Sequence, residues 1–136
     1  VIIIVCGSMT YLWPATDNDD DDDEQARNAL SITIRQHLVS IAAGAFQDFL
    51  RLQQVHLPLS LKMIGLEAFK GCLALTDINF PSSLIQIQDE AFEGCTSLKQ
   101  VQFVDGLQLL GSGVFEGCEG LTTAILPSTL EFLGTA

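Results

Sequence analysis

Positive charge is scarce in this 136-residue chain, in which six Lys and Arg face 17 Asp and Glu and the formal net charge is -11. A protein that binds a nucleic-acid backbone needs a basic surface, so we expect no nucleic acid among its partners. Charged residues make up only 17% of the chain and hydrophobic residues 48%, a balance that argues against wholesale disorder. The length suits one domain with one sizeable core.

Motifs of metal, cofactor and catalytic chemistry are missing as well. The sequence has no Cys-x-x-Cys pair, no glycine-rich phosphate loop, no His-Glu-x-x-His helix and no Gly-x-Ser-x-Gly elbow. Neither His37 nor His56 stands at zinc-ligand spacing from a cysteine pair. His56 beside Asp77, without a placed nucleophile, is not a catalytic triad. We therefore expect no cofactor, no metal and no enzymatic activity.

The start of the chain differs in character from the rest, and residues 1–16 are predicted to be an apolar leader. No basic residue precedes Arg27, so the leader lacks the positive start of a secretory signal. Its apolar stretch, residues 1–13, is shorter than the about 20 residues that a membrane-spanning helix needs. Three interpretations stay open: a truncated anchor or signal core, a buried strand, or an arbitrary cut in a longer protein. Anchoring through residues 1–13 has no further support in the sequence.

An acidic run follows at residues 17–24, Asp-Asn-Asp-Asp-Asp-Asp-Asp-Glu. Neighbouring carboxylates repel one another, so residues 17–28 are predicted to form an extended, disordered linker. A Ca²⁺ site would need carboxylates placed by a turn, with a glycine in the EF-hand type, and the run has no glycine. Whether the run binds divalent cations weakly is left open.

A 23-residue repeat dominates the remainder of the chain, and six series of residues recur at this interval in register. One 23-residue unit cannot bury its apolar face alone, so successive units are predicted to stack as superposed coils. Residues 29–136 are thus predicted to be a solenoid of about four and a half coils, truncated because no polar segment caps its end. The clearest series are Phe46, Phe69, Phe92 and Phe115; Cys72, Cys95 and Cys118; and Ile41, Ile64, Ile87, Leu110 and Leu133.

Each coil is predicted to contain two short extended pieces and one tight turn. In the clearest copy these are residues 75–81, residues 84–87 and residues 89–92, the last resembling one helical or 3-10 turn. Gly94 would close that turn, since glycine tolerates a positive φ. The phenylalanines are predicted to form a stacked core spine and the cysteines to fill a tight inner corner. Metal ligation by the cysteines, or a disulfide between neighbouring coils, is the alternative. The core-facing residues of the first piece are Leu75, Ile78 and Phe80.

The pattern resembles a known family. The element Ala-Phe-x-Gly-Cys-x-x-Leu at residues 68–75 and 91–98, with Pro81-Ser82-Ser83-Leu84 before the second, resembles the BspA-like, Treponema-type leucine-rich repeats. Residues 45–52 depart from it with Asp48-Phe49 in place of Gly-Cys, as suits an edge coil. The resemblance covers about residues 29–136. It implies an α/β, right-handed solenoid with short parallel strands on the concave side and short helical or 3-10 turns.

The resemblance also implies a function, namely non-enzymatic recognition of a protein or peptide, or of a glycan, often at the cell surface; a cytoplasmic location stays open. Amide and hydroxyl groups both donate and accept hydrogen bonds, so the polar outward residues of the concave strands suit such a partner. The alternative is a purely structural segment of a larger surface or adhesive protein, because an exposed strand face is polar in any case. The candidate partner-binding residues are Gln53, Gln54, His56, Thr76, Asp77, Asn79, Lys99, Gln100 and Gln102.

Overall fold

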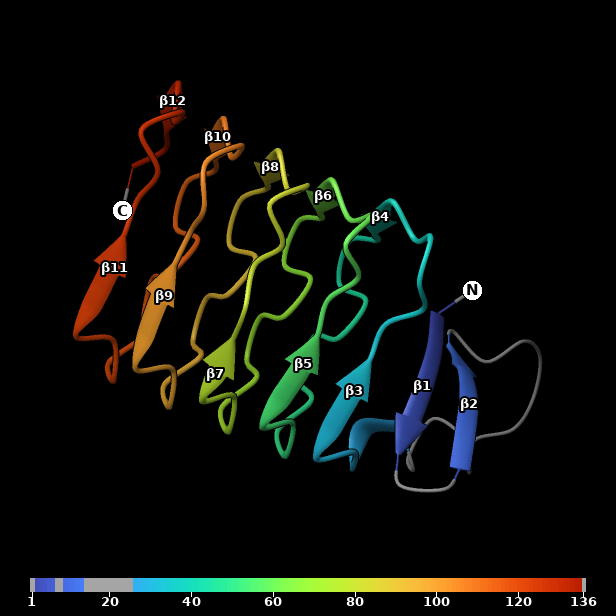
Figure 1. Cartoon of the computed structure of the whole chain (residues 1–136). Helices are drawn as coiled ribbons and strands as arrows, with labels where there is room; N and C mark the ends of the chain where they lie inside the picture. The colour runs from blue at the N-terminus through green and yellow to red at the C-terminus, as the bar shows by residue number, and fades with distance from the viewer. Residues whose placement is uncertain (1, 7–8, 14–25, 136) are drawn as a thin grey trace.

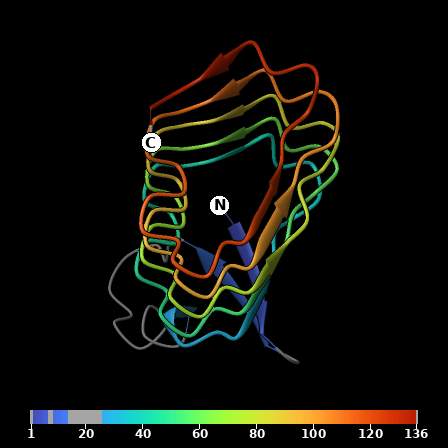
Figure 2. The ribbon, with the colours of Figure 1, turned by 90° about the vertical axis from the view of Figure 1, so that its left-hand side faces the viewer.

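The computed structural model describes residues 2–6, 9–13 and 26–135, the first two segments by their backbone alone. From β3 onward the chain winds into coils that lie side by side, and each coil adds one strand to each of two sides (Figure 1). Viewed along the stack, the coils superpose into one outline (Figure 2). The strands of one side are β3 (Ser31–Thr33), β5 (Gln54–His56), β7 (Asp77–Ile78), β9 (Gln100–Gln102) and β11 (Thr123–Ile125). Those of the other side are β4 (Ser40–Ile41), β6 (Met63–Ile64), β8 (Gln86–Ile87), β10 (Leu109–Leu110) and β12 (Phe132–Leu133).

The two sides pair differently. The even-numbered strands form one parallel five-stranded sheet in the order β12-β10-β8-β6-β4. The odd-numbered strands form two parallel sheets, β3-β5-β7 and β11-β9. Partner residues are one repeat apart, as in Ser31 opposite Gln54 and Gln54 opposite Asp77. The outward side chains along β3, β5, β7, β9 and β11 are called the odd-strand face below.

A third set of hydrogen bonds links the coils through their turns. Phe46 N–H donates to the Ala68 carbonyl at 2.7 Å, and Phe69 N–H donates to the Ala91 carbonyl at 2.8 Å. Each turn therefore satisfies its backbone groups with the next coil, as a strand does, and does not need a helix to do so. The predicted parallel solenoid is confirmed.

The α/β part of the prediction is not confirmed, because the described residues contain almost no helix. The turns do hold i to i+3 bonds of the 3-10 type, such as Cys95 N–H to the Phe92 carbonyl at 3.2 Å. Glu90 has φ 55° and Gly94 has φ 72°, so left-handed residues bracket each turn and a right-handed helix cannot extend through them. The predicted positive φ at Gly94 is confirmed.

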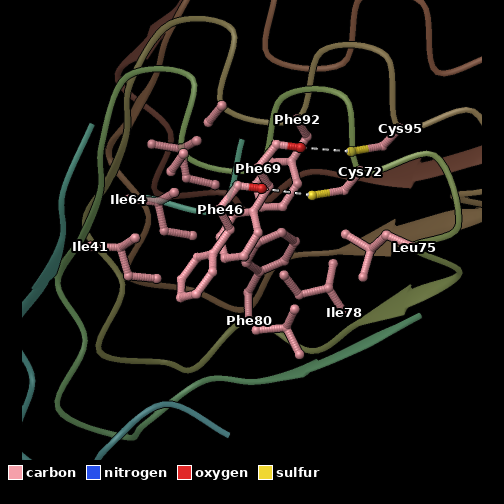
Figure 3. Close-up of a cluster of buried hydrophobic side chains, with 14 of the residues drawn as sticks. Ile41, Phe46, Ile64, Phe69, Cys72, Leu75, Ile78, Phe80, Phe92 and Cys95 are labelled. Atoms are coloured by element: carbon pink, nitrogen blue, oxygen red, sulfur yellow. Dashed lines mark hydrogen bonds between the residues drawn. The ribbon is translucent and has the colours of Figure 1, made fainter. Parts of the chain in front are cut away.

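The interior is a column of apolar side chains in register. Phe46, Phe69 and Phe92 are fully buried, and their rings stack with centroids 5.1 Å apart at both steps (Figure 3). Phe115 continues the series 5.8 Å from Phe92. Burying a phenylalanine contributes about 1.5–3 kcal/mol, so this spine is a major source of stability. The core-facing strand residues predicted from the repeat, Leu75, Ile78 and Phe80, are buried too.

The cysteines line the inner corner beside this spine, as predicted. Cys72 Sγ donates to the Phe46 carbonyl at 3.2 Å, and Cys95 Sγ donates to the Phe69 carbonyl at 3.3 Å (Figure 3). Cys118 repeats the contact with Phe92 at 3.1 Å, and all three are buried free thiols. Burial raises the pKa of Cys72 to about 12, so the thiol is neutral at physiological pH. Within the described part of the chain, no group of three or more His, Cys, Asp or Glu is placed to hold a metal ion.

The first coil closes its end of the core with a larger residue. Phe49 stands where later coils have cysteine; it is buried and meets Phe46 edge to face at 5.4 Å. The Arg27 guanidinium lies 5.8 Å from the centroid of the Phe49 ring, a cation–π distance. Ala26, in the predicted linker, is buried, whereas the acidic run lies outside the described residues.

The leader forms a β-hairpin in its described parts. Strands β1 (Ile2–Cys6) and β2 (Met9–Trp13) pair antiparallel, and β1 lies beside β3 at the end of the stack (Figure 1). Among the residues that the structure describes, no helix has the length and apolarity to cross a membrane. The role of the leader stays a prediction.

Candidate functional site

Five of the nine candidates lie on the odd-strand face, because side chains alternate in and out along each strand; they are Gln54, His56, Asp77, Gln100 and Gln102. The other four, Gln53, Thr76, Asn79 and Lys99, directly flank these strands. In β5 and β9 the middle residue, Val55 or Val101, is buried and its two neighbours are exposed. Asp77 lies opposite Gln54 and Gln100 lies opposite Thr123 in the parallel pairing. Eight candidates are exposed and one, Thr76, is half-buried; the exposed ones are Gln53, Gln54, His56, Asp77, Asn79, Lys99, Gln100 and Gln102.

The odd-strand face opens where its two sheets meet. β7 pairs with β5 and β9 pairs with β11, while β7 and β9 share no ladder in the described solenoid. A hollow of about 100 Å³ lies at this junction. Four predicted site residues come together around it, and Ile78, Val101, Thr123 and Ile125 complete its lining. The four predicted residues are Asp77, Asn79, Gln100 and Gln102.

A second, wider depression of about 420 Å³ lies beside the strands and contains Thr76 and Lys99. The rest of its lining comes from Gly120 and from three residues that carry a hydroxyl group, Thr96, Ser97 and Thr122. The remaining candidates, Gln53, Gln54 and His56, lie on an earlier coil and line neither hollow. The structure thus divides the nine residues into a carboxylate–amide group, a hydroxyl–lysine group and a separate group on β5.

A groove on the opposite side was missed by the sequence analysis. It has a volume of about 460 Å³, lies over β8, β10 and β12, and is lined in part by exposed Leu66, Leu109 and Phe132. Leu109 and Phe132 occupy the same repeat position as Gln86, and this change from polar to apolar along the stack was the available signal.

The main ion-pair network belongs to the turns and not to the odd-strand face. Lys70 Nζ lies 3.1 Å from Glu67, 2.8 Å from Glu90 and 2.8 Å from Glu93. Hydrogen bonds to these carboxylates hold the pKa of Lys70 well above its ordinary value, and the Lys70 ammonium lowers the pKa of Glu90. Because Glu67 and Glu90 come from neighbouring coils, Lys70 acts as a link between coils.

A stack of 23-residue coils with parallel strands on two sides defines the protein as a β-solenoid repeat protein. The family model of the BspA type leucine rich repeat region matches residues 24–136 in six copies, and the chain belongs to this family. The predicted family is confirmed. A comparison with curated proteins finds no match.

Solved structures of bacterial proteins have the same fold. A leucine-rich repeat protein from Bacteroides ovatus is 35% identical over 80% of this chain, with a TM-score of 0.74, and the match spans 28% of that protein. The pneumococcal vaccine antigen PcpA is 24% identical over 76% of this chain and 29% of its own, with a TM-score of 0.67. The T. pallidum leucine rich repeat protein is 24% identical over 73% of this chain and 71% of its own, with a TM-score of 0.54. The last two likenesses concern the fold alone.

Proposed function

We propose that the chain is a non-enzymatic recognition module that binds a protein or peptide through the odd-strand face, which we take as the concave side. Repeats of this family generally serve in protein interaction or as structural repeats. The observation that carries the proposal is the convergence of Asp77, Asn79, Gln100 and Gln102 around one hollow on an exposed sheet face.

The chemistry of this face supports an extended peptide as ligand. Gln54 and Asp77 lie opposite each other in the β5–β7 ladder, where equivalent side chains are about 4.8 Å apart, and Gln100 follows across the junction. Their amides and carboxylate therefore form a row of hydrogen-bonding groups. A peptide backbone offers alternating donors and acceptors, and amide side chains satisfy both. A glycan presents hydroxyl groups that could use the same row, which makes glycan binding an outcome for the experiment below. We place the protein at the cell surface or outside the cell, as a part of this proposal.

A structural role is the second candidate, because an exposed strand face is polar whether or not it binds a ligand. Backbone bonds such as the one from Phe46 N–H to the Ala68 carbonyl join each coil to the next, so the segment would also suit a purely architectural array. Such an array would need no ligand at the odd-strand face.

Peptide and glycan arrays probed with the purified chain would distinguish these candidates. A variant that combines Gln54→Ala, Asp77→Ala and Gln100→Ala removes the central row of the odd-strand face and should abolish binding without changing the circular dichroism spectrum. The reason is that all three side chains are exposed and none packs in the core.

A matched control replaces three exposed polar residues outside the odd-strand face: Gln36→Ala, Gln108→Ala and Glu131→Ala. The control should bind as the unmodified chain does. Binding that survives the first triple change would contradict the proposed face. If the chain binds glycans and no peptides, the ligand is a glycan and not a peptide. If the chain binds nothing on either array, the architectural role is favoured.

A further inference from the structure

The hollow between β7 and β9 has the dimensions of a pocket for one side chain. Its volume of about 100 Å³ is below the roughly 300 Å³ at which pockets for whole small molecules begin. It therefore suits a single group that projects from a larger partner. Its lining comes from β7, β9 and β11 and the residue after β7, at the junction where the two odd-numbered sheets share no ladder.

The lining of the hollow favours a cation with several hydrogen-bond donors. The lining includes the carboxylate of Asp77 and the side-chain amides of Asn79, Gln100 and Gln102, whose oxygens are able to accept hydrogen bonds. The one side-chain contact of Asp77 in the described structure is with a neutral group, since Thr76 Oγ1 donates to Asp77 Oδ2 at 3.0 Å. The negative charge of Asp77 is thus not neutralised by a salt bridge among the described residues.

Charge around the hollow supports the same ligand. Lys99 lines the neighbouring depression and is absent from the lining of the hollow, so no cation of the described chain occupies this site. From residue 26 onward the chain has 10 Asp and Glu against 6 Lys and Arg, a net charge of -4, which favours basic partners at long range. Ile125, half exposed at the rim, offers apolar surface against which the aliphatic stem of a long basic side chain could lie.

We propose that this hollow binds the guanidinium group of an arginine on the partner protein, with Asp77 as its counter-ion and the three amide oxygens as further acceptors. The inference rests on the proposed function, because it assigns one anchor to the odd-strand face. Arginine fits better than lysine because its planar group carries five donors in a fixed arrangement and can meet the carboxylate and the amides at once.

The test uses Nα-acetyl-arginine amide as the probe, titrated into the ¹⁵N-labelled full chain and followed by NMR. The isosteric probe Nα-acetyl-citrulline amide lacks the charge and serves as the matched ligand control. We expect saturable shifts of the Asn79, Gln100 and Gln102 amide signals, with a Kd of about 1–10 mM, as suits one anchored side chain. The citrulline probe should bind about tenfold or more weakly, because it cannot form the charge-assisted bonds.

Two variants locate the effect. Asp77→Asn should remove the preference for the arginine probe, whereas Glu131→Gln, which neutralises an exposed carboxylate directly before β12 on the opposite side, should leave the preference intact. Equal shifts with both probes, shifts unchanged by Asp77→Asn, or no shifts near the hollow would each overturn the arginine site.

The failure of this inference can be separated from the failure of the proposed function. If the array ligands still depend on Gln54 and Gln100 while Asp77→Asn alone has no effect, the odd-strand face binds its partner without an arginine anchor. If the arginine probe binds at Asp77 but the triple variant keeps its array ligands, the pocket exists and the recognition face lies elsewhere.

Discussion

Removal of one ring from the aromatic spine should destabilise the protein more than any surface change. Phe69 is fully buried and stacks on Phe46 and Phe92, with both centroid distances at 5.1 Å. Truncation of a buried phenylalanine to alanine costs about 3–5 kcal/mol through lost transfer free energy and the cavity left behind. The two lost ring pairs, about 0.5–1.5 kcal/mol each, place Phe69→Ala toward the upper end of that range. Because a domain is stable by only about 5–15 kcal/mol, this single change removes a large share.

Urea unfolding followed by circular dichroism measures the effect. The matched control is Phe132→Ala, because Phe132 is 57% exposed and its truncation should change the free energy of unfolding by less than about 0.5 kcal/mol. If Phe69→Ala does not fold, Phe69→Leu fills most of the space and should cost about 1–3 kcal/mol. Equal losses for Phe69 and Phe132 variants would refute the stacked core as the source of stability.

Three further predictions concern the cysteine corner, the ion-pair network and the open end. Burial keeps the Cys72 thiol protonated to about pH 12 while an unfolded thiol ionises near pH 8.5, so stability from the neutral thiol is lost as pH rises between these values. Urea titrations across this range should show a steeper decline for the unmodified chain than for Cys72→Val, and parallel declines would contradict the burial argument. Lys70→Gln should lower the Tm by a few degrees. The difference should be smaller in about 1 M salt, because the salt already weakens these ion pairs in the unmodified chain. The Lys70 ammonium lowers the pKa of Glu90, so the stability from this pair is present above the ordinary carboxyl pKa of about 4.3 and is lost as pH falls below it. In Lys70→Gln the loss of stability at low pH should be smaller than in the unmodified chain. If the two chains show the same dependence of Tm on pH, Lys70 does not link the coils. Fusion of one consensus coil after residue 136 should cover Leu133 and raise the Tm in calorimetry; an unchanged Tm would mean that the coils do not stabilise one another.

The repeat period made the core predictable because every contact between coils joins residues about one repeat apart. Phe46 meets Phe69, and Gln54 lies opposite Asp77, at the same separation in sequence. The sequence separation of the residues in each long-range contact is therefore known in advance, and the packing between coils follows from the repeat period. The same offset placed the nine candidate residues on or beside the odd-numbered strands of successive coils, and the arrays test whether they bind a partner.

The backbone conformation of the turns did not follow from the repeat period. Residues 89–92 were predicted to be a helical or 3-10 turn from their acids, yet Glu67 and Glu90 have φ 53° and 55°. Gly44 and Gly113 occupy the same repeat position with φ 63° and 61°. Glycine in two of four copies was the signal for a left-handed residue, and it argued against a helix at that point.

The gap between β7 and β9 could not be predicted from the repeat. Asn79 and Gln102 stand in the same series as His56, and nothing in that series marks one junction as different. The separation of the odd-numbered strands into three and two depends on small differences in how whole coils superpose. The structure gives no single residue as its cause.

Core packing and the proposed recognition involve different residues of the same coil, and this separation makes the proposals testable. In the coil around β7, Ile78 is buried in the core while Asp77 and Asn79 on either side are exposed. Asp77→Asn keeps the shape of the side chain and an oxygen that can accept from Thr76, so the free energy of unfolding should change by less than about 0.5 kcal/mol. Any loss of arginine preference in that variant then reports the charge at the hollow and not a change in fold. A drop in stability of more than about 1 kcal/mol would show instead that Asp77 helps to hold the coils together, and the hollow would have to be explained as part of the scaffold.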